Sequence, residues 1–157
     1  MGTRSETLAA KVETTIEDLL AAVEQSTPEQ WAAPCSDGEW TQGFAAFHAA
    51  SSIGPIAQTV KDIAQGQPFP SMTMEELDAR NAVQAKEHAD CTKAETIELI
   101  KNAAPAAASM LRSLSDAELD RKVKLPEPMP EVTVEMFVGM AMVGHSAYHT
   151  QTITGAR

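Results

Sequence analysis

Two histidines near the C-terminal end of the chain stand four residues apart, in the segment VGHSAYHTQTI. On an α-helix, side chains at this spacing lie on one face with Cβ atoms roughly 5–6 Å apart. His145 and His149 are therefore able to converge on one divalent ion at the about 2.0–2.1 Å that imidazole nitrogen prefers for zinc. Two core histidines, hydrogen-bonded to backbone carbonyl groups or to water, would show the same spacing.

A third inward-facing histidine would favour the metal interpretation. Catalytic zinc sites generally use three protein ligands and leave one position for water or substrate. The chain has two further histidines, His48 and His88. His48 borders the apolar face of a predicted helix, and His88 shares a predicted face with Leu77 and Asn81. The residues alone do not choose between these two candidates.

The segment that carries the histidine pair is predicted to be a helix from about 134 to 154, capped by Thr133 and ended by Gly155. Steps of about 100° per residue place one set of side chains on a common side of this helix. That set consists of Val134, Val138, Met142, His145 and His149. Both imidazoles are therefore expected to face the protein interior.

Three further helices are predicted from apolar residues spaced three and four apart. The first ends near Gln25, the second runs from about 42 to 63 with a kink at Pro55, and the third runs from about 74 to 114. For the third helix, an interruption near Asp90 and a kink at Pro105 are left open. Its inward face would carry Met74, Leu77, Asn81, Ala85 and His88, and later Leu99.

The connectors complete the predicted architecture. Short helical turns are expected at 28–31 and from 115, and the proline-rich segment LPEPMPE cannot be helical throughout. Strand-like alternation does not extend beyond a few residues around 123–125. The chain is thus predicted to be an all-α four-helix bundle with long connectors and short extra helical turns, forming a single domain over 1–157. The longer connectors allow a topology other than simple up-down-up-down.

Charge and composition exclude several classes of protein. With 12 Lys and Arg against 22 Asp and Glu, the net charge is −10, which repels phosphate backbones and anionic membranes. No stretch reaches 18 apolar residues, and the N-terminal segment has no apolar region typical of a signal peptide. Cys35 and Cys91 cannot form a disulfide framework, so we expect a cytoplasmic protein whose cysteines are small buried residues outside the site.

The order of these residues resembles that of the DinB/YfiT-like superfamily of four-helix metalloproteins. The resemblance rests on the loop DGEWT with Trp40, on His48 in the next helix, on the run LSDAEL at 114–119, and on the closing HSAYHT motif. Each motif is short, and their combination is specific. The resemblance implies a divalent metal, most often zinc or nickel, on one histidine of the second helix and two of the fourth. These are His48, His145 and His149.

The same resemblance implies an enzyme. Family members include thiol-dependent S-transferases that use bacillithiol or mycothiol and a mycothiol-dependent maleylpyruvate isomerase, and homodimers are frequent. We therefore expect a divalent metal on three histidines to activate a thiol or water for S-transfer, isomerisation or hydrolysis of a small molecule. No motif identifies the substrate or a particular low-molecular-weight thiol. Iron and other metals also accept imidazole, so the residues do not identify the ion.

Three residues are candidates to line a substrate cavity: Asn81, His88 and Tyr148. For Tyr148, packing beside Phe137 is the simpler expectation. Two alternatives to an enzyme stay open. One is a non-catalytic bundle that binds a small molecule or a partner, with or without metal, and the other is a structural homodimer in which the histidines belong only to the core.

Overall fold

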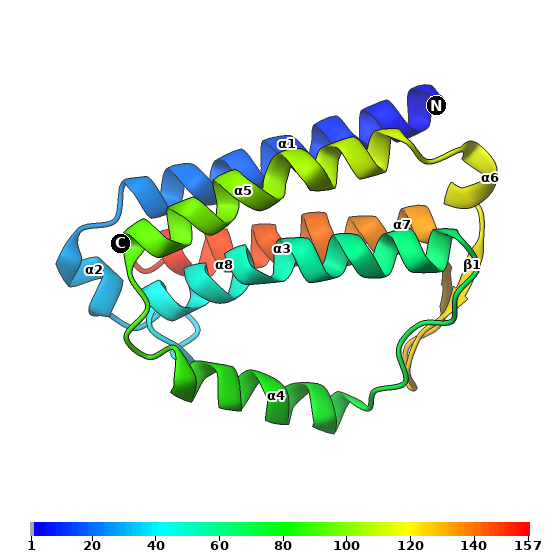
Figure 1. The fold of residues 1–157 in the computed structure, drawn as a ribbon. Coiled ribbons are helices and arrows are strands. Elements are labelled where there is room, and N and C mark those ends of the chain that lie inside the picture. Colours follow the sequence, from blue (N-terminus) through cyan, green and yellow to red (C-terminus); the bar gives the residue numbers. More distant parts are fainter. Residues whose placement is uncertain (1) are drawn as a thin grey trace.

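Four long helical segments form a bundle in the computed structural model, which describes residues 2–157 (Figure 1). Three are single helices: α1 (Thr3–Glu24), α3 (Gln42–Ala64) and α5 (Lys93–Arg112). The fourth is built from α7 (Val134–Val138), the π-helix η1 (Gly139–Gly144) and α8 (His145–Thr154). The predicted all-α four-helix bundle is confirmed.

The order of the helices around the bundle differs from their order in the sequence. α1 and α3 each pack against both α5 and α8, so the successive helices α1 and α3 lie diagonally opposite each other. α1 and α8 run in one direction, whereas α3 and α5 run in the other (Figure 1). The bundle therefore has a topology other than simple up-down-up-down, as the long connectors allowed.

A helix outside the bundle makes the parallel arrangement of α3 and α5 feasible. α4 (Met74–Glu87) returns the chain along the outside of the molecule to the end at which α5 begins (Figure 1). The prediction of one long helix from 74 to 114 is therefore wrong, although an interruption near Asp90 is present. Thr92 caps α5 with its side chain, and this capping box begins a new helix.

The predicted inward face of the third helix lies toward the bundle over its first half but does not enter the core. Leu77, Asn81, Ala85 and His88 are half-buried, and only Met74 is misplaced. No residue of α4 is buried, and Met74 at its start is 42% exposed. The physical reason is that α4 carries too few large apolar side chains to form a stripe that could enter a core.

Side-chain caps fix the starts of most helices. α2 (Pro28–Ala32), α4, α5 and α6 (Asp116–Leu119) each begin with a complete capping box, in which a Ser or Thr and the third helical residue satisfy each other's backbone amides. Thr41 and Thr133 cap α3 and α7 in the simpler way, by accepting one backbone N–H. These caps set where each helix enters the bundle.

A small antiparallel hairpin closes the end of the bundle at which α5 ends and α7 begins. β1 (Lys122–Lys124) pairs with β2 (Glu131–Thr133), and Val123 lies opposite Val132 with both side chains buried. The sequence indicated only a fragment of strand here. Two strands of three residues are stable because their inward valines join the main core.

The core fills the space between the four long segments. Its fully buried side chains include Leu19 from α1, Ile63 from α3 and Ile100 from α5. Val134 and Val138 contribute from the C-terminal segment, as the predicted stripe requires. Among the helices of residues 2–157, none combines the length and the apolar composition that a membrane span requires.

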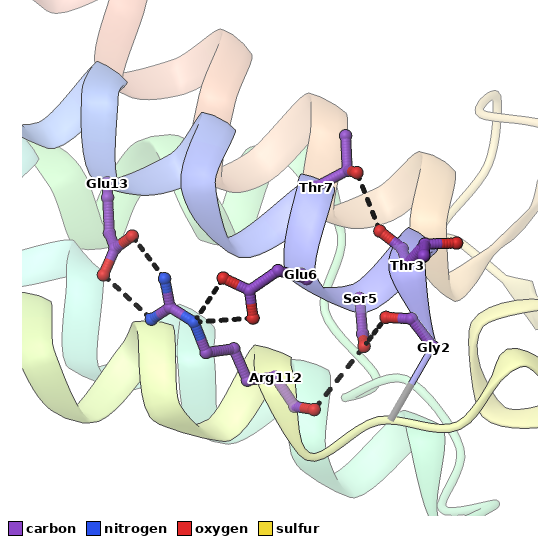
Figure 2. A network of polar contacts seen from close by, with 7 residues as sticks. All are labelled: Gly2, Thr3, Ser5, Glu6, Thr7, Glu13 and Arg112. Atoms are coloured by element: carbon purple, nitrogen blue, oxygen red, sulfur yellow. Dashed lines mark hydrogen bonds and ion pairs between the residues drawn. The ribbon is translucent and has the colours of Figure 1, made fainter.

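Ion pairs join α1 to α5 along the surface of the bundle (Figure 2). The Arg112 guanidinium donates to both carboxylate oxygens of Glu13, at 2.9 and 2.7 Å, and to Glu6 at 3.0 Å. Such fork-shaped pairing is geometrically specific. It fixes the register of two antiparallel neighbours whose sequences lie far apart.

Candidate metal centre

Three of the four histidines converge between α3 and α8. His48 comes from α3, and His145 and His149 come from successive turns of α8. One ring nitrogen from each lies within 4.8 Å of the other two. Within residues 2–157, this is the one cluster of histidine, cysteine or carboxylate side chains with a spacing suited to a metal ion.

One pair of ring nitrogens has the separation expected of two ligands on one ion. The Nε2 atoms of His48 and His145 lie 3.2 Å apart. Two nitrogens at about 2.0–2.1 Å from one ion, at octahedral or tetrahedral angles, lie roughly 2.8–3.4 Å from each other. The rings of His145 and His149 are nearly perpendicular, with centroids 4.6 Å apart.

The π-helix η1 sets the direction in which His145 points. The backbone N–H of His145 bonds to the carbonyl oxygen of Met140, five residues earlier, so the turn before it is wider than an α-helical turn. After Met142, the centre of the buried stripe consequently moves to Ser146, which is 3% exposed. His145 lies at the edge of this stripe, half-buried and facing His48 across the bundle.

All three imidazoles are held in the neutral form that binds metals. Burial lowers the pKa of His145 to about 4, and the nearby His48 adds to this effect. Burial also lowers the pKa of His149 to about 3, with smaller contributions from His145 and His48. The pKa of His48 is lowered by burial and by the charge of Arg80, against a hydrogen bond with Gln84 that raises it.

A loop before α3 covers the other side of the cluster. Trp40 lies against two of the imidazoles, with ring centroids 4.9 Å from His48 and 5.8 Å from His149. The loop is tied to α8 by a hydrogen bond from the Ser36 N–H to the carbonyl oxygen of Thr152, at 2.9 Å. An aromatic wall of this kind excludes water from one side of the histidines.

Tyr148 makes a second hydrogen bond between α8 and the loop before α3. Its hydroxyl donates to the Asp37 carboxylate at 2.8 Å, and the side chain is 52% exposed. The expectation that Tyr148 packs beside Phe137 is wrong, because Phe137 faces inward and contacts Phe69 instead. The hydrogen bond to Tyr148 is the main cause of the lowered pKa of Asp37.

The other candidates from the sequence lie on or beside α4. His88, at the end of α4, stacks on Phe47 with ring centroids 4.6 Å apart and does not join the three imidazoles. The structure thus selects His48 rather than His88 as the partner of the C-terminal pair. Asn81 lies half-buried on α4, and its lining of a cavity stays a prediction. Cys35 and Cys91 are both buried and free.

One contact from α4 was not expected from the sequence. The Gln84 side-chain oxygen lies 2.8 Å from Nδ1 of His48, on the ring edge opposite the atom that faces His145. Metal-ligating histidines usually bond through their second nitrogen to such a partner. A glutamine in the middle of a polar helix carries no sequence signal that would reveal this role.

The cavities and grooves of the protein do not by themselves locate the site. A cavity of about 10 Å³, enough for about one water molecule, lies beside His145 and is bordered by Ser52 and Ser146. A groove of about 770 Å³ lies elsewhere, between the segment 66–73 and the residues of β1. It includes none of the three histidines, so we locate the candidate site by its donor atoms rather than by volume.

The donor set fits a divalent transition metal. Imidazole nitrogen suits zinc, nickel, iron and copper, whereas calcium and magnesium require oxygen ligands. Three neutral imidazoles leave at least one coordination position for a further ligand. A helical bundle with such a cluster between two of its helices defines a class of protein that can hold a metal ion and present it to a small molecule.

Comparison with known proteins identifies the family. The family model of the DinB superfamily matches residues 11–153, and the chain belongs to this superfamily. The fold is similar to that of YfiT from Bacillus subtilis, described as "a probable metal-dependent hydrolase with an unusual four-helix bundle topology". The two share 21% sequence identity with a TM-score of 0.76, over 99% of this chain and 87% of that one.

A second solved structure has the same fold. It is an uncharacterized protein from Clostridium difficile 630, with a TM-score of 0.72 and 14% identity, over 99% of this chain and 96% of the other. Among curated proteins, none matches the chain. These comparisons confirm the predicted superfamily and its fold.

Proposed function

We propose that the protein is a metal-dependent enzyme in which His48, His145 and His149 hold one divalent ion, zinc or nickel by preference. The observation that carries this proposal is the convergence of three neutral imidazoles from two helices on a common point. The fold adds support, because YfiT is described as a probable metal-dependent hydrolase. The proposed reaction is S-transfer, isomerisation or hydrolysis of a small molecule.

The ion and the residues of the chain would have different roles in the proposed reaction. A divalent cation at this position would lower the pKa of an adjacent thiol or water molecule and so generate a nucleophile near neutral pH. The residues of the chain orient and shield that position. His145 and His149 project from one rigid helix, Gln84 contacts the outer nitrogen of His48, and Trp40 covers one side.

Elemental analysis of protein purified without an affinity tag tests the proposal directly. We expect about one zinc or nickel ion per chain, and we expect His149→Ala to lose it. His88→Ala is the matched control, since it removes the one histidine outside the cluster and should keep the ion. Retention of the metal by His149→Ala, at wild-type stoichiometry, would overturn the proposal.

Activity assays separate the enzyme from a non-catalytic bundle. The metal-loaded protein would be incubated with ester and amide substrates, and separately with bacillithiol or mycothiol and an electrophilic halide. Turnover that disappears in His145→Ala and persists in His88→Ala supports catalysis. Stoichiometric metal without turnover over the whole panel would favour the alternative, a bundle that binds a small molecule or a partner.

We also propose that the chain acts as a single domain, forms a homodimer, and resides in a reducing compartment such as the cytoplasm. Its two cysteines are free and buried, as expected where disulfides do not form. Light scattering coupled to size-exclusion chromatography measures the mass in solution directly. A mass near the 16.8 kDa of one chain, at all concentrations, would contradict the dimer.

A further inference from the structure

Gln84 is the residue through which the outer helix α4 makes side-chain hydrogen bonds to the bundle. Its amide makes two contacts with α3: the oxygen lies 2.8 Å from Nδ1 of His48, and the nitrogen lies 3.1 Å from the Ser51 hydroxyl. No residue of α4 is buried, so packing alone does not explain why this side chain is fixed. The two contacts form part of a closed set of hydrogen bonds.

The protons in this set can be assigned from the donors and acceptors available. The Ser51 hydroxyl has one proton, and it donates to the carbonyl oxygen of His48 at 3.2 Å. The Ser51 oxygen must then accept from the amide nitrogen of Gln84, because an amide NH₂ group can only donate. The amide oxygen of Gln84 consequently faces His48.

This assignment fixes the tautomer of His48. An amide oxygen can only accept, so Nδ1 of His48 must carry the proton of the neutral ring. Nε2 is then unprotonated and can act only as an acceptor. The same Nε2 atom faces the Nε2 atom of His145 at 3.2 Å, inside the three-histidine cluster.

We propose that Gln84 is a positioning residue that holds His48 in the Nδ1–H tautomer, with Nε2 directed into the cluster as a metal-ready donor. An isolated neutral histidine in water favours the opposite, Nε2–H tautomer, so the glutamine selects the minor form. The proposal that this prepares a ligand rests on the proposed metal function. The tautomer itself is a property of the metal-free protein.

A second contact joins α4 to the bundle: His88 stacks on Phe47, near the C-terminal end of the helix. Gln84 lies one turn earlier and contacts the ligand side chain itself. The position of α4 and the orientation of His48 are thereby linked, and a change that moves the helix would change the donor available to the ion.

Nitrogen-15 NMR of the metal-free protein tests the tautomer. Long-range proton–nitrogen spectra distinguish protonated from unprotonated ring nitrogens, and His48→Ala assigns the signals. We expect His48 in the wild type to be protonated at Nδ1, and Gln84→Met to shift it toward the Nε2–H form. Gln84→Glu keeps an oxygen acceptor for Nδ1–H and should restore the wild-type tautomer. Observation of the Nε2–H form in the wild type would overturn the inference, whatever the metal content.

Metal affinity supplies the second measurement, by competition of zinc with a chromophoric chelator. We expect Gln84→Met to weaken zinc binding about 10–100-fold, as outer partners of ligating histidines commonly do, and Gln84→Glu to recover most of the loss. Gln58→Met is the matched control, because Gln58 is exposed and its side chain bonds only to Asp62 on the same helix. Unchanged affinity in Gln84→Met would overturn the positioning role.

The two proposals, the metal function and the tautomer of His48, can be contradicted separately. If wild-type protein binds no zinc or nickel, the proposed metal function fails, whereas the NMR result on Gln84 and His48 still stands or falls by itself. Circular dichroism confirms that each variant is folded before either measurement. Because α4 lies outside the core, substitutions at Gln84 are expected to leave the bundle intact.

Discussion

The indole ring of Trp40 lies nearly parallel to the imidazole ring of His149, with ring centroids 5.8 Å apart and an angle of 16° between the planes. A fluorophore in this position should report on the histidine cluster. Trp31, the other tryptophan, donates instead to the carbonyl oxygen of Cys91 and stacks on no histidine among the described residues. In Trp31→Phe, nickel should therefore quench the remaining emission, with saturation at one ion per chain.

The converse variant provides the control for this titration. Trp40→Phe leaves only Trp31, and its emission should respond less to the same nickel additions. Equal quenching in the two variants would mean that the ion does not bind beside Trp40. Saturation at several ions per chain would indicate binding to the acidic surface instead of the cluster.

Metal binding should raise thermal stability. A ligand that binds only the folded state stabilises it by about 2.7 kcal/mol at a free concentration 100 times its Kd. We expect zinc added to chelator-treated wild type to raise Tm, and to raise it much less in His48→Ala or His149→Ala. Differential scanning calorimetry at matched free zinc measures both. An equal rise in wild type and in His149→Ala would place the binding elsewhere.

The metal-free protein should lose stability as the pH falls through the mildly acidic range. In the folded state, the pKa values of His145 and His149 are lowered from 6.5 to about 4 and about 3. The unfolded chain thus binds more protons between these values, so stability rises with pH over this interval. The contribution is fully present above about pH 6.5 and is lost as the pH falls toward the folded pKa values.

Urea unfolding at a series of pH values measures this dependence. The slope between about pH 6.5 and 4 should be smaller in His145→Gln and His149→Gln, which remove one titrating group each and keep a polar side chain. His88→Gln is the control, because His88 lies outside the cluster. A slope unchanged in both cluster variants would show that their rings are not held neutral by burial.

The regular features of the fold followed from local sequence, because they depend on residues close together in the chain. Thr133 caps the start of the C-terminal segment as predicted, and the inward stripe of Val134, Val138 and Met142 was correct. The order of helices around the bundle was not predictable in this way. It depends on which apolar faces meet, and several arrangements bury the same stripes.

The candidate site was likewise predictable only where it depends on residues close together in the chain. The spacing of His145 and His149 predicted their convergence, because side chains four positions apart lie on the same face of a helix. His48 was selected over His88 only by the resemblance to a family, since the two lie on different helices. Gln84 was not predicted at all. Its contact with His48 depends on where the outer helix α4 crosses α3, and the residue pattern of α4 does not predict this position.

Two glycines on α3 should respond differently to alanine. A Cβ atom on Gly43 would overlap the Trp31 indole, whereas a Cβ on Gly54 would be crowded only by its chain neighbour Pro55. Gly43 lies in the first turn of α3, in contact with the Trp31 indole. That indole donates a hydrogen bond to the carbonyl oxygen of Cys91, which fixes its position. Gly43→Ala must displace the ring or the helix start.

We expect Gly43→Ala to lower the free energy of unfolding by about 1–3 kcal/mol, the usual cost of overpacking. Gly54→Ala should change it by less than about 1 kcal/mol, because the higher helix propensity of alanine is offset by crowding between its Cβ and the ring of Pro55. Urea unfolding of both variants, followed by circular dichroism, measures the pair under identical conditions. Since α3 also carries His48, displacement of its first turn should weaken zinc binding in Gly43→Ala and leave it unchanged in Gly54→Ala. Stabilisation by Gly43→Ala would show that Trp31 moves freely and does not fix the start of α3.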